Sequence, residues 1–408
     1  MNVEELVRAS LREQADDGMR PPAGFADRVL TVRRRRRTRA IAGLAVATAA
    51  VVAAAVGVPA LDGGGEDVRP ASDKQPGDVI AHPDQSPPRD LIAAGNTALA
   101  AFYTVKNTKQ PGGDELMTRT YGLLDQKTGK YEKAPEKWAW IDVAPGMRTA
   151  AVLEGELPAR RIGILDLITG KVARWIPVDH QVAGVSWSPD GSKLVATAYS
   201  KNPDRLIDLP GDHPDNEPQR HGSRTGFYVI DSSSGQVGTF RELPQKTDSE
   251  FGFFEGNSRE DLEWSRDGKL LYVQLAMGAD GENRAWYTLK GDKTKEPAAE
   301  RYAGWPEAGL SPDGKLLASD GNDKGSPVLD PRTGKEITKV PGQQLLAWAD
   351  NKRIIAWGCD PKKCGGKGEF RNQLLLVTVG SKKVVPLSDF RKASDTYPGR
   401  WSPLFATR

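Results

Sequence analysis

The chain has 408 residues, a formal net charge of +3 and 27% charged residues. This length exceeds what one compact domain usually needs, so we expect one large domain with appended segments. The charge is uneven, because residues 1–39 carry ten Arg and six acidic residues, whereas residues 62–408 carry 47 basic and 48 acidic residues. Since the large part lacks surplus positive charge, we expect no nucleic-acid partner for it.

Residues 1–39 combine short apolar patterns with a basic run. Apolar residues recur at helical spacing over residues 3–11, and a second short set at residues 25–30 follows Pro21 and Pro22. Two such short helices bury too little surface to fold alone. The segment is therefore either a disordered basic tail that sets topology or a docking segment that folds on a cytosolic protein partner, and both readings stay open.

Residues 40–61, AIAGLAVATAAVVAAAVGVPAL, contain no charged residue. A helix of this length covers about 33 Å, enough for a hydrocarbon core of about 30 Å. Arginines directly before the run predict an N-terminus in the cytoplasm and a chain outside it from residue 62 onward. These arginines are Arg33, Arg34, Arg35, Arg36, Arg37 and Arg39. We expect one uncleaved transmembrane signal-anchor in the cell membrane; a cleavable signal peptide ending at Ala60 remains the alternative.

This plan of a short cytosolic segment, one span and an exported domain resembles bacterial transmembrane regulators of the anti-sigma type. The resemblance covers roughly the first 60 residues, and it implies that residues 1–39 relay a state to a cytosolic partner. Residues 1–39 contain neither His nor Cys, so the zinc ligands of many such regulators are missing here.

Residues 62–97 are predicted to be a linker, because Gly, Pro, Asp and Ser are dense over most of this stretch. The structured domain is predicted to cover residues 98–408.

That domain repeats the phrase Trp-Ser-Pro-Asp-Gly-x-Lys-Leu with variations. Pro pre-sets φ for a turn, Asp bonds back to the backbone and Gly accepts a left-handed conformation. The residues assigned to turns are Pro189, Asp190, Gly191, Asp267, Gly268, Pro312, Asp313 and Gly314. A large aromatic side chain at the strand end can fill the seam between neighbouring sheets. The residues assigned to seams are Trp187, Trp264, Trp348 and Trp401.

A second phrase, Asp-x-x-Thr-Gly, interleaves with the first and begins at Asp125, Asp166, Asp231 and Asp330. Together the two phrases predict an all-β fold, a β-propeller of four-stranded blades. The complete blades are assigned to residues 138–178, 182–243, 261–298, 307–342 and 344–390. Residues 98–133 supply three more strands and residues 399–408 the fourth, which closes the ring. The count is six blades, with a seventh left open.

The copies Trp187-Ser188-Pro189-Asp190-Gly191, Trp264-Ser265 with Asp267-Gly268, and Ser311-Pro312-Asp313-Gly314 resemble the WD-repeat-like propeller family. That family includes the C-terminal domain of TolB and the propellers of prolyl-oligopeptidase-type enzymes. The resemblance covers residues 98–408 and implies the fold, but it says little about activity, because the motif residues build turns and seams. The Gly-His and terminal Trp-Asp of eukaryotic WD repeats are missing.

Cys359 and Cys364 are the only cysteines, and an exported domain would favour a disulfide between them. A zinc site would need further ligands near them in the sequence. The polar insertion that runs from Asn202 to Gly226 is expected to project from one face. Its Asp212, His213, Asp215 and His221 form at most a weak ligand set, and a solvated loop is the simpler reading.

No catalytic, cofactor-binding or metal-binding residue is predicted, and a Gly-x-Ser-x-Gly elbow is missing. We therefore expect a non-enzymatic binding, sensor or scaffold module of the bacterial envelope, with a protein or polysaccharide ligand. The alternatives are a cleaved, secreted propeller and an envelope enzyme with its pocket at the propeller channel. The enzyme would need converging titratable groups on the innermost strands.

Overall fold

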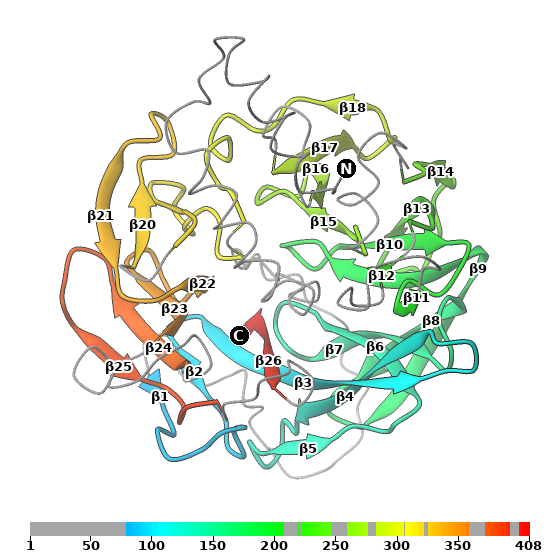
Figure 1. The fold of residues 1–408 in the computed structure, drawn as a ribbon, viewed down its shortest axis with the longest axis horizontal. Helices are drawn as coiled ribbons and strands as arrows, with labels where there is room; N and C mark the ends of the chain where they lie inside the picture. Colours follow the sequence, from blue (N-terminus) through cyan, green and yellow to red (C-terminus); the bar gives the residue numbers. More distant parts are fainter. Residues whose placement is uncertain are drawn as a thin grey trace, which may run out of the picture. The chain divides into compact units, whose positions relative to one another are not determined.

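The computed structural model describes residues 79–207, 219–220, 222–245, 259–275, 283–305, 307–321, 325–358, 372–391 and 400–408. The chain divides into two compact units, Met1–Gly43 and Leu44–Arg408. All described residues belong to the second unit, and their regular structure consists of strands, without an α-helix. Figure 1 shows antiparallel sheets that follow one another around a centre in this unit. This all-β arrangement is consistent with a β-propeller.

One sheet contains seven strands, and each strand pairs antiparallel with its neighbour in a sequence that follows the chain. They are β6 (Trp138–Val143), β7 (Thr149–Glu154), β8 (Ala159–Asp166), β9 (Lys171–Trp187), β10 (Lys193–Tyr199), β13 (Arg224–Asp231) and β14 (Arg241–Glu242). The long strand β9 serves two groups of four strands, because its first half pairs with β8 and its second half with β10. The division falls near Val182, where the sequence predicts the boundary between two blades.

Three further sheets follow. The first contains β15 (Leu262–Trp264), β16 (Leu270–Gln274), β17 (Arg284–Thr288) and β18 (Lys293–Thr294). The second contains β19 (Leu317–Ala318), β20 (Ser326–Leu329) and β21 (Glu336–Val340), and a bridge between Leu310 and Leu317 extends it. The third contains β22 (Gln344–Trp348), β23 (Arg353–Gly358), β24 (Gln373–Thr378) and β25 (Val384–Pro386).

The two ends of the described chain share one sheet. Strand β26 (Trp401–Thr407) pairs with β3 (Thr97–Lys109), with Trp401 opposite Thr104 and Thr407 opposite Thr97. Beyond β3 lie β4 (Glu115–Leu124) and β5 (Tyr131–Lys133). The predicted pairing of residues 399–408 with the strands of 98–133 is therefore confirmed.

The predicted domain boundary at residue 98 differs from the structure. Strands β1 (Val79–Ile80) and β2 (Ala93–Ala94) pair with each other, and β2 pairs with β3. Leu91 and Ile92 are 3% and 0% exposed. The Pro and Gly content suggested a linker, but residues 79–97 pack against the sheet because they carry enough apolar side chains to bury. The rest of the predicted linker, residues 62–78, lies outside the described residues.

The described ends of the insertion after Asn202 are paired in a sheet, which the sequence did not predict. Its described ends form β11 (Arg205–Ile207) and β12 (Gln219–Arg220), which pair with each other. Strand β11 pairs in addition with β4, where Arg205 lies opposite Leu116. The insertion therefore joins the sheet of β3 and β4. The remaining insertion residues proposed as a weak ligand set, including His213 and His221, lie outside the described residues.

Local bonds explain why the repeated phrase turns the chain. Gly191 N–H donates to Ser188 O at 2.8 Å, and Lys193 N–H donates to Ser188 Oγ at 2.9 Å. The copies at Ser265 and Ser311 repeat these bonds at 2.9 to 3.0 Å. The glycines Gly191, Gly268 and Gly314 have φ values of 71°, 68° and 70°. A side chain on the backbone is disfavoured there, so glycine closes the turn.

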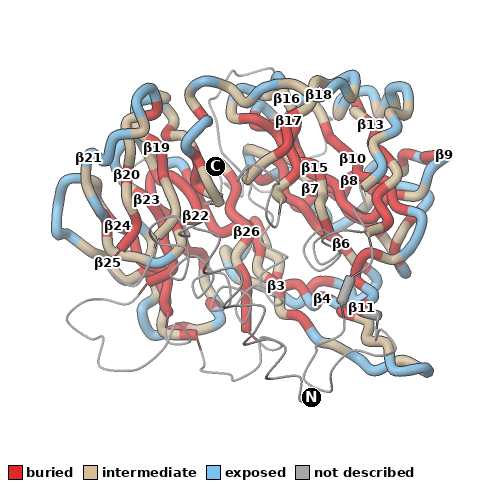
Figure 2. The backbone as a smooth tube through the Cα atoms, turned by 45° about the horizontal axis from the view of Figure 1, so that its top comes forward, coloured by how far each residue is buried: buried red, intermediate tan, exposed pale blue. Residues whose placement is uncertain are grey.

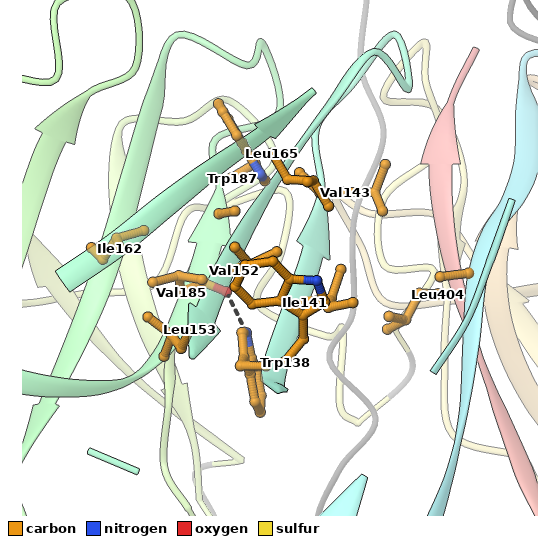
Figure 3. Packing of buried hydrophobic residues seen from close by; sticks show 14 of the residues in the cluster. Trp138, Ile141, Val143, Val152, Leu153, Ile162, Leu165, Val185, Trp187 and Leu404 are labelled. Carbon is orange, nitrogen blue, oxygen red and sulfur yellow. Dashed lines mark hydrogen bonds between the residues drawn. The ribbon is translucent and has the colours of Figure 1, made fainter. Parts of the chain in front are cut away.

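The core lies along the middle of the strands, and the turns are exposed (Figure 2). The largest apolar cluster includes Ile141 and Val143 of β6, Val185 of β9 and Leu404 of β26 (Figure 3). Strand β26 contacts β6, and β9 and β10 contact β15, so neighbouring sheets share side chains across their seams. No helix in the described residues is long and apolar enough to cross a membrane, and the predicted span at residues 40–61 lies outside them.

Candidate functional site

The repeated tryptophans lie at seams between sheets. The indole N–H of Trp187 donates to Asp142 O of β6 at 3.1 Å, and that of Trp264 donates to Ser186 O of β9 at 3.1 Å. The indole N–H of Trp348 donates to Gly309 O at 3.0 Å. Each of these buried side chains therefore bonds to the backbone of the preceding group of strands, so each joins two groups by packing and by a hydrogen bond.

Trp401 differs from the other copies, because it contacts the segment between β1 and β2, which contains Ser86. Its indole N–H donates to Ser86 Oγ at 3.0 Å. Its ring meets Trp357 edge-on at 4.8 Å and Phe102 at 5.8 Å. Trp401 thus closes the seam where β26, β23 and the segment between β1 and β2 come together.

The turn residues contact mainly their own turns. Asp190 Oδ1 accepts a bond from Ser188 Oγ at 2.6 Å, and Asp267 and Asp313 accept equivalent bonds from Ser265 and Ser311 at 2.8 and 2.9 Å. Pro189 and Pro312 occupy the second turn position, where the copy at Trp264 has Arg266. Pro189 also lies beside the Gly268 turn of the next sheet. The predicted turn residues therefore follow one another from sheet to sheet and do not form one chemical centre.

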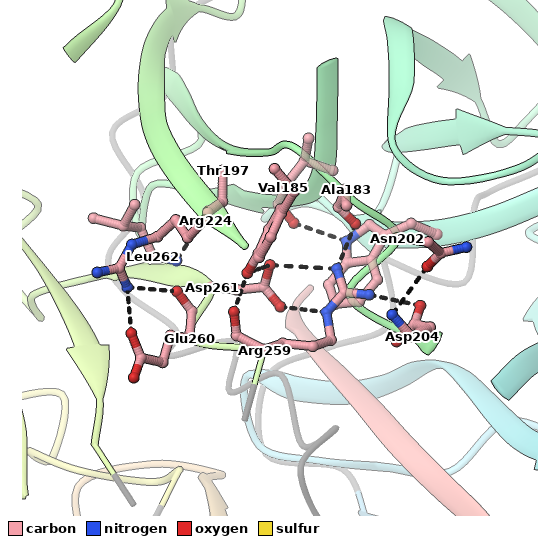
Figure 4. A network of polar contacts seen from close by, with 12 residues as sticks. Ala183, Val185, Thr197, Asn202, Asp204, Arg224, Arg259, Glu260, Asp261 and Leu262 are labelled. Atoms are coloured by element: carbon pink, nitrogen blue, oxygen red, sulfur yellow. Dashed lines mark hydrogen bonds and ion pairs between the residues drawn. The ribbon is translucent and has the colours of Figure 1, made fainter. Parts of the chain in front are cut away.

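A buried cluster of charges, which we call the Arg–Asp clamp, consists of Arg119, Asp204, Arg259 and Asp261. Figure 4 labels Asp204, Arg259 and Asp261 of this cluster. Arg119 Nη1 and Nη2 donate to Asp204 Oδ2 and Oδ1 at 2.6 and 2.9 Å. Arg259 Nη1 donates to the same Asp204 Oδ2 at 2.7 Å. All three side chains are 2% exposed. One carboxylate therefore holds two guanidinium groups inside the fold.

The clamp brings together segments that are distant in the sequence. Arg119 comes from β4, Asp204 from the insertion, and Arg259 from the residues before β15. Both guanidinium groups lie over the ring of Trp140 in β6, at 4.9 and 4.3 Å from its centre. Arg259 Nε also donates to Asp261 Oδ2 at 2.7 Å. The insertion is thereby fastened across the sheet of β6 to the sheet of β3 and β4.

Charge balance explains how the clamp tolerates burial. Burial is the largest influence and acts to lower the pKa of Arg119 and of Arg259. The charge and hydrogen bonds of Asp204 at Arg119, and the charges of Asp204 and Asp261 with the Asp261 hydrogen bond at Arg259, together outweigh it, so both pKa values are raised. Burial also raises the pKa of Tyr199, whose hydroxyl donates to Arg259 O. Nearby, Arg224 Nη1 donates to Glu260 Oε2 at 2.8 Å in a second buried pair. The carboxylates therefore keep the arginines charged, and burial keeps the Tyr199 hydroxyl neutral.

A second set of buried acids, which we call the inner acid group, comprises Asp142, Glu263, Glu300 and Glu307. Burial raises the pKa of Asp142 to about 7 and that of Glu307 to about 7. Burial, followed by the charge of Asp142, raises the pKa of Glu263 well above its usual value. Burial likewise raises the pKa of Glu300, although Arg284 at 3.7 Å opposes this. The group therefore favours protonated carboxyls.

Three members of the inner acid group lie on or shortly before the first strand of a group of strands, and Glu300 follows β18. Asp142 is in β6, Glu263 is in β15, and Glu307 precedes Leu310. Glu307 Oε1 accepts a bond from Gln344 Nε2 of β22 at 2.6 Å. Within the described ranges, no three His, Cys, Asp or Glu side chains gather closely enough to hold a metal ion. The arrangement is suited to proton binding and to joining strands.

Neither cluster was predicted, although the sequence contains a signal. Asp142 and Glu263 interrupt apolar strand ends in "WIDV" and "LEW", where a charge is unusual unless a partner faces it. The partners of these acids come from other sheets. The predicted disulfide residues Cys359 and Cys364 and the arginines from Arg33 to Arg39 lie outside the described residues.

No protein-family model and no curated protein matches the sequence. Solved structures with a similar fold include TolB from Acinetobacter baumannii, with a TM-score of 0.39 and 15% identity, which covers 78% of this chain and 68% of TolB. Hydrazine synthase from Kuenenia stuttgartiensis gives a TM-score of 0.33 and 16% identity over 62% of this chain and 67% of that one. Acylaminoacyl peptidase from Pyrococcus horikoshii gives 0.39 and 13% identity over 74% of this chain and 46% of the peptidase. At these identities the likeness concerns the fold alone.

Proposed function

We propose that this protein is a membrane-anchored, extracytoplasmic binding module of the bacterial envelope, built as a TolB-like propeller of six blades. Six groups of strands support this count. The first combines β26 with β3 to β5, and the second and third share β9. The last three are the sheets that begin with β15, with the bridge at Leu310 and with β22. A seventh blade would need strands outside the described residues.

The observation that carries a binding role is the mutual pairing of the buried charges. Asp204 holds both Arg119 and Arg259, and Glu260 holds Arg224. A side chain held in a buried pair stiffens the sheets but is poorly placed to attack a substrate. A stiff frame of this kind presents its connecting loops to a ligand, which we take to be an envelope protein or polysaccharide.

The proposed location rests on the sequence. The arginines from Arg33 to Arg39 directly precede the uncharged residues 40–61, and this order favours a cytoplasmic N-terminus and a single span. Residues 1–39 would then be available to a cytosolic protein partner, as in the anti-sigma type of regulator. The domain would then lie outside the cytoplasm, and residues 62–78 would join it to the membrane span.

The location can be tested by labelling Cys359 and Cys364 with a thiol reagent that does not cross membranes. We expect intact cells to be labelled only after reduction, since an exported domain favours the disulfide. A control variant with a single cysteine in residues 1–39 should be labelled only after lysis. Labelling of that control in intact cells would reverse the proposed orientation.

The ligand-binding role can be tested by crosslinking the full chain in cells, once through the loops and once through residues 1–39. Recovery of a specific envelope protein or polysaccharide at the loops supports binding. Recovery of only lipid and ribosomal contacts at residues 1–39 would remove the relay to a cytosolic partner but leave the binding module.

A second candidate, an envelope enzyme with its site at the centre of the propeller, is favoured by the inner acid group. Raised pKa values on converging strands are typical of general acids. Glu307 Oε2 is buried and has no hydrogen-bond partner among the described residues. Substitution of Glu307 by Gln should abolish turnover of a substrate if this candidate holds, and should leave ligand binding intact if the protein is a binding module.

A further inference from the structure

Three side chains occupy equivalent positions on the first strands of three consecutive groups of strands. Asp142, Ser186 and Glu263 each lie two residues before the N–H that closes the following turn, which belongs to Ala144, Ser188 and Ser265. Asp142 Oδ2 accepts the backbone N–H of Trp187 at 2.9 Å. Glu263 Oε2 accepts Ser186 Oγ–H at 2.8 Å. The two carboxyls therefore bond across both seams of β9, one on each side.

Asp142 is unusual because it is fully buried and one of its carboxyl oxygens has no hydrogen-bond donor among the described residues. The residue is 0% exposed, and its Oδ1 has no hydrogen-bond partner among the described residues. An ionised carboxylate in such a place is strongly disfavoured, and such groups take up a proton instead. Here geometry alone favours the neutral acid.

The described groups that face these two carboxyls supply one positive charge, that of Arg284, and Glu300 also uses it. Asp142 is faced by the N–H groups of Trp187 and Val143 and by the carboxyl of Glu263. Glu263 is faced by Ser186 of β9, Asp142 of β6, Asp261 and Arg284 of β17. Tyr272 of β16 also lies within electrostatic reach of Glu263. Arg284 is shared with Glu300 at 3.7 Å, and Asp261 is engaged by Arg259 at 2.7 Å.

We propose that Asp142 and Glu263 form a proton-binding site that fastens the sheets of β6, β9 and β15 to one another, so that alkaline conditions loosen both seams. The chemical ligand is the proton, and the responding element is the pair of seams on either side of β9. The effect of external pH on the loops rests on the proposed extracytoplasmic location; the proton site itself does not.

The direction of the effect follows from linkage. Burial raises the pKa of Asp142 to about 7 and also raises that of Glu263. Unfolded carboxyls titrate near 4, so the folded chain binds more protons than the unfolded chain above that pH. The stabilisation is fully present below about pH 4 and is lost as pH rises through the folded values. Each proton held only by the folded state changes the unfolding equilibrium constant about tenfold per pH unit.

The test uses the purified full chain in detergent, unfolded by urea at several values between pH 5 and pH 8. We compare the parent chain with Glu263→Gln, Asp142→Asn and the control Asp179→Asn, which changes an exposed carboxyl. In the parent chain and in the control, unfolding should become more favourable by about tenfold or more per pH unit. Each neutral variant should flatten this dependence by about one proton. Infrared difference spectra should show the carbonyl stretch of a protonated carboxyl in the parent chain, and each variant should weaken it.

Each outcome decides the proposal. Equal pH dependence and equal infrared bands in the parent chain and both variants would overturn it. Gln and Asn keep the acceptor oxygens and imitate the protonated acids, so failure of both variants to fold would also overturn it, because the ionised form would then be the one that the fold needs. If only one variant folds, its slope and its infrared band decide for that carboxyl. A flattened pH slope in the variants, together with no specific ligand recovered by crosslinking through the loops, would count against the proposed function and not against the proton site.

Discussion

The aspartate turns and the Arg–Asp clamp both depend on carboxylates, but their partners lie at different distances along the chain. In the turn at Ser265, the carboxylate of Asp267 accepts the Ser265 hydroxyl and the Lys269 N–H, each two residues away. In the clamp, Asp204 is 85 residues from Arg119 and 55 residues from Arg259. A turn therefore forms within its own segment, whereas the clamp forms only when three segments of the domain have come together.

Solvent exposure separates the two regions further. Lys269 and Asp267 in the turn have side chains that are 80% and 52% exposed, whereas the three charged groups around Asp204 are 2% exposed. Exposed pairs contribute little, because water screens them and the long side chains lose freedom. Buried pairs contribute little relative to apolar packing but cost much when one partner is removed. Substitutions in the two regions should therefore change the free energy of unfolding by different amounts, and their effects should differ in additivity.

The largest effect is expected for Asp204→Ala. The change leaves the guanidinium groups of Arg119 and Arg259 buried without their shared carboxylate, and loss of one partner of a buried pair costs about 3–5 kcal/mol. Urea unfolding of the full chain measures the loss. As a control, Glu154→Ala removes the half-buried partner of the exposed Arg161 and Lys137 and should cost about 0–1 kcal/mol.

A second variant sharpens this test. Replacement of Arg119 by Met, Asp204 by Leu and Arg259 by Met together removes every charge of the cluster around Asp204. Replacement of a whole buried ionic group by apolar residues is often neutral or stabilising, so the triple variant should be more stable than Asp204→Ala. If it is less stable, the guanidinium contacts with Trp140 contribute more than the ion pairs.

The next effect is expected for Trp264→Ala. The side chain is 5% exposed and bonds across the seam to Ser186 O at 3.1 Å. Truncation of a buried aromatic side chain costs about 3–5 kcal/mol. Thermal unfolding followed by circular dichroism measures it. Trp175→Ala is the matched control, because Trp175 is only half-buried beneath the exposed Arg161. An equal loss in both variants would show that the seam position is not special.

A smaller effect is expected for Gly268→Ala in the turn. Gly268 has a φ of 68°, and an added Cβ would meet only Pro189 Cδ at 3.7 Å, an ordinary contact. The cost is therefore conformational and should be about 1–2 kcal/mol. Gly314→Ala should behave alike, and the double variant should show the sum, because the two turns share no bonding partner. A clearly non-additive result in urea unfolding would mean that the turns are coupled through the sheets.

These differences explain which features could be predicted. The turn at Asp190 and the pairing of residues 399–408 follow from motifs whose meaning lies within a few residues, so both are visible in the sequence. The insertion that ends in β11 and β12 looked like a free loop, since its partner β4 is far away in the sequence. The strand at Ala93 was hidden in a segment whose composition suggested a linker. Asp142 showed only as a charge in an apolar strand, without a sign of which group would face it.

The smallest expected effect concerns Asp231, and it runs opposite to that of the inner acid group. The backbone N–H of Ser234 at 2.8 Å, with the hydroxyls of Ser233 and Ser234, lowers the pKa of Asp231 to about 2. Its contribution is therefore present above the unfolded value near 4 and is lost as pH falls through about 2. Asp231→Asn should flatten the acid side of the stability profile below pH 4 and leave the slope between pH 5 and pH 8 unchanged. Glu263→Gln should do the reverse in the same urea titrations. If either variant changed the stability profile both below pH 4 and between pH 5 and pH 8, the turn at Asp231 and the inner acid group would titrate as one system. The distinction between local and distant partners would then fail for this domain.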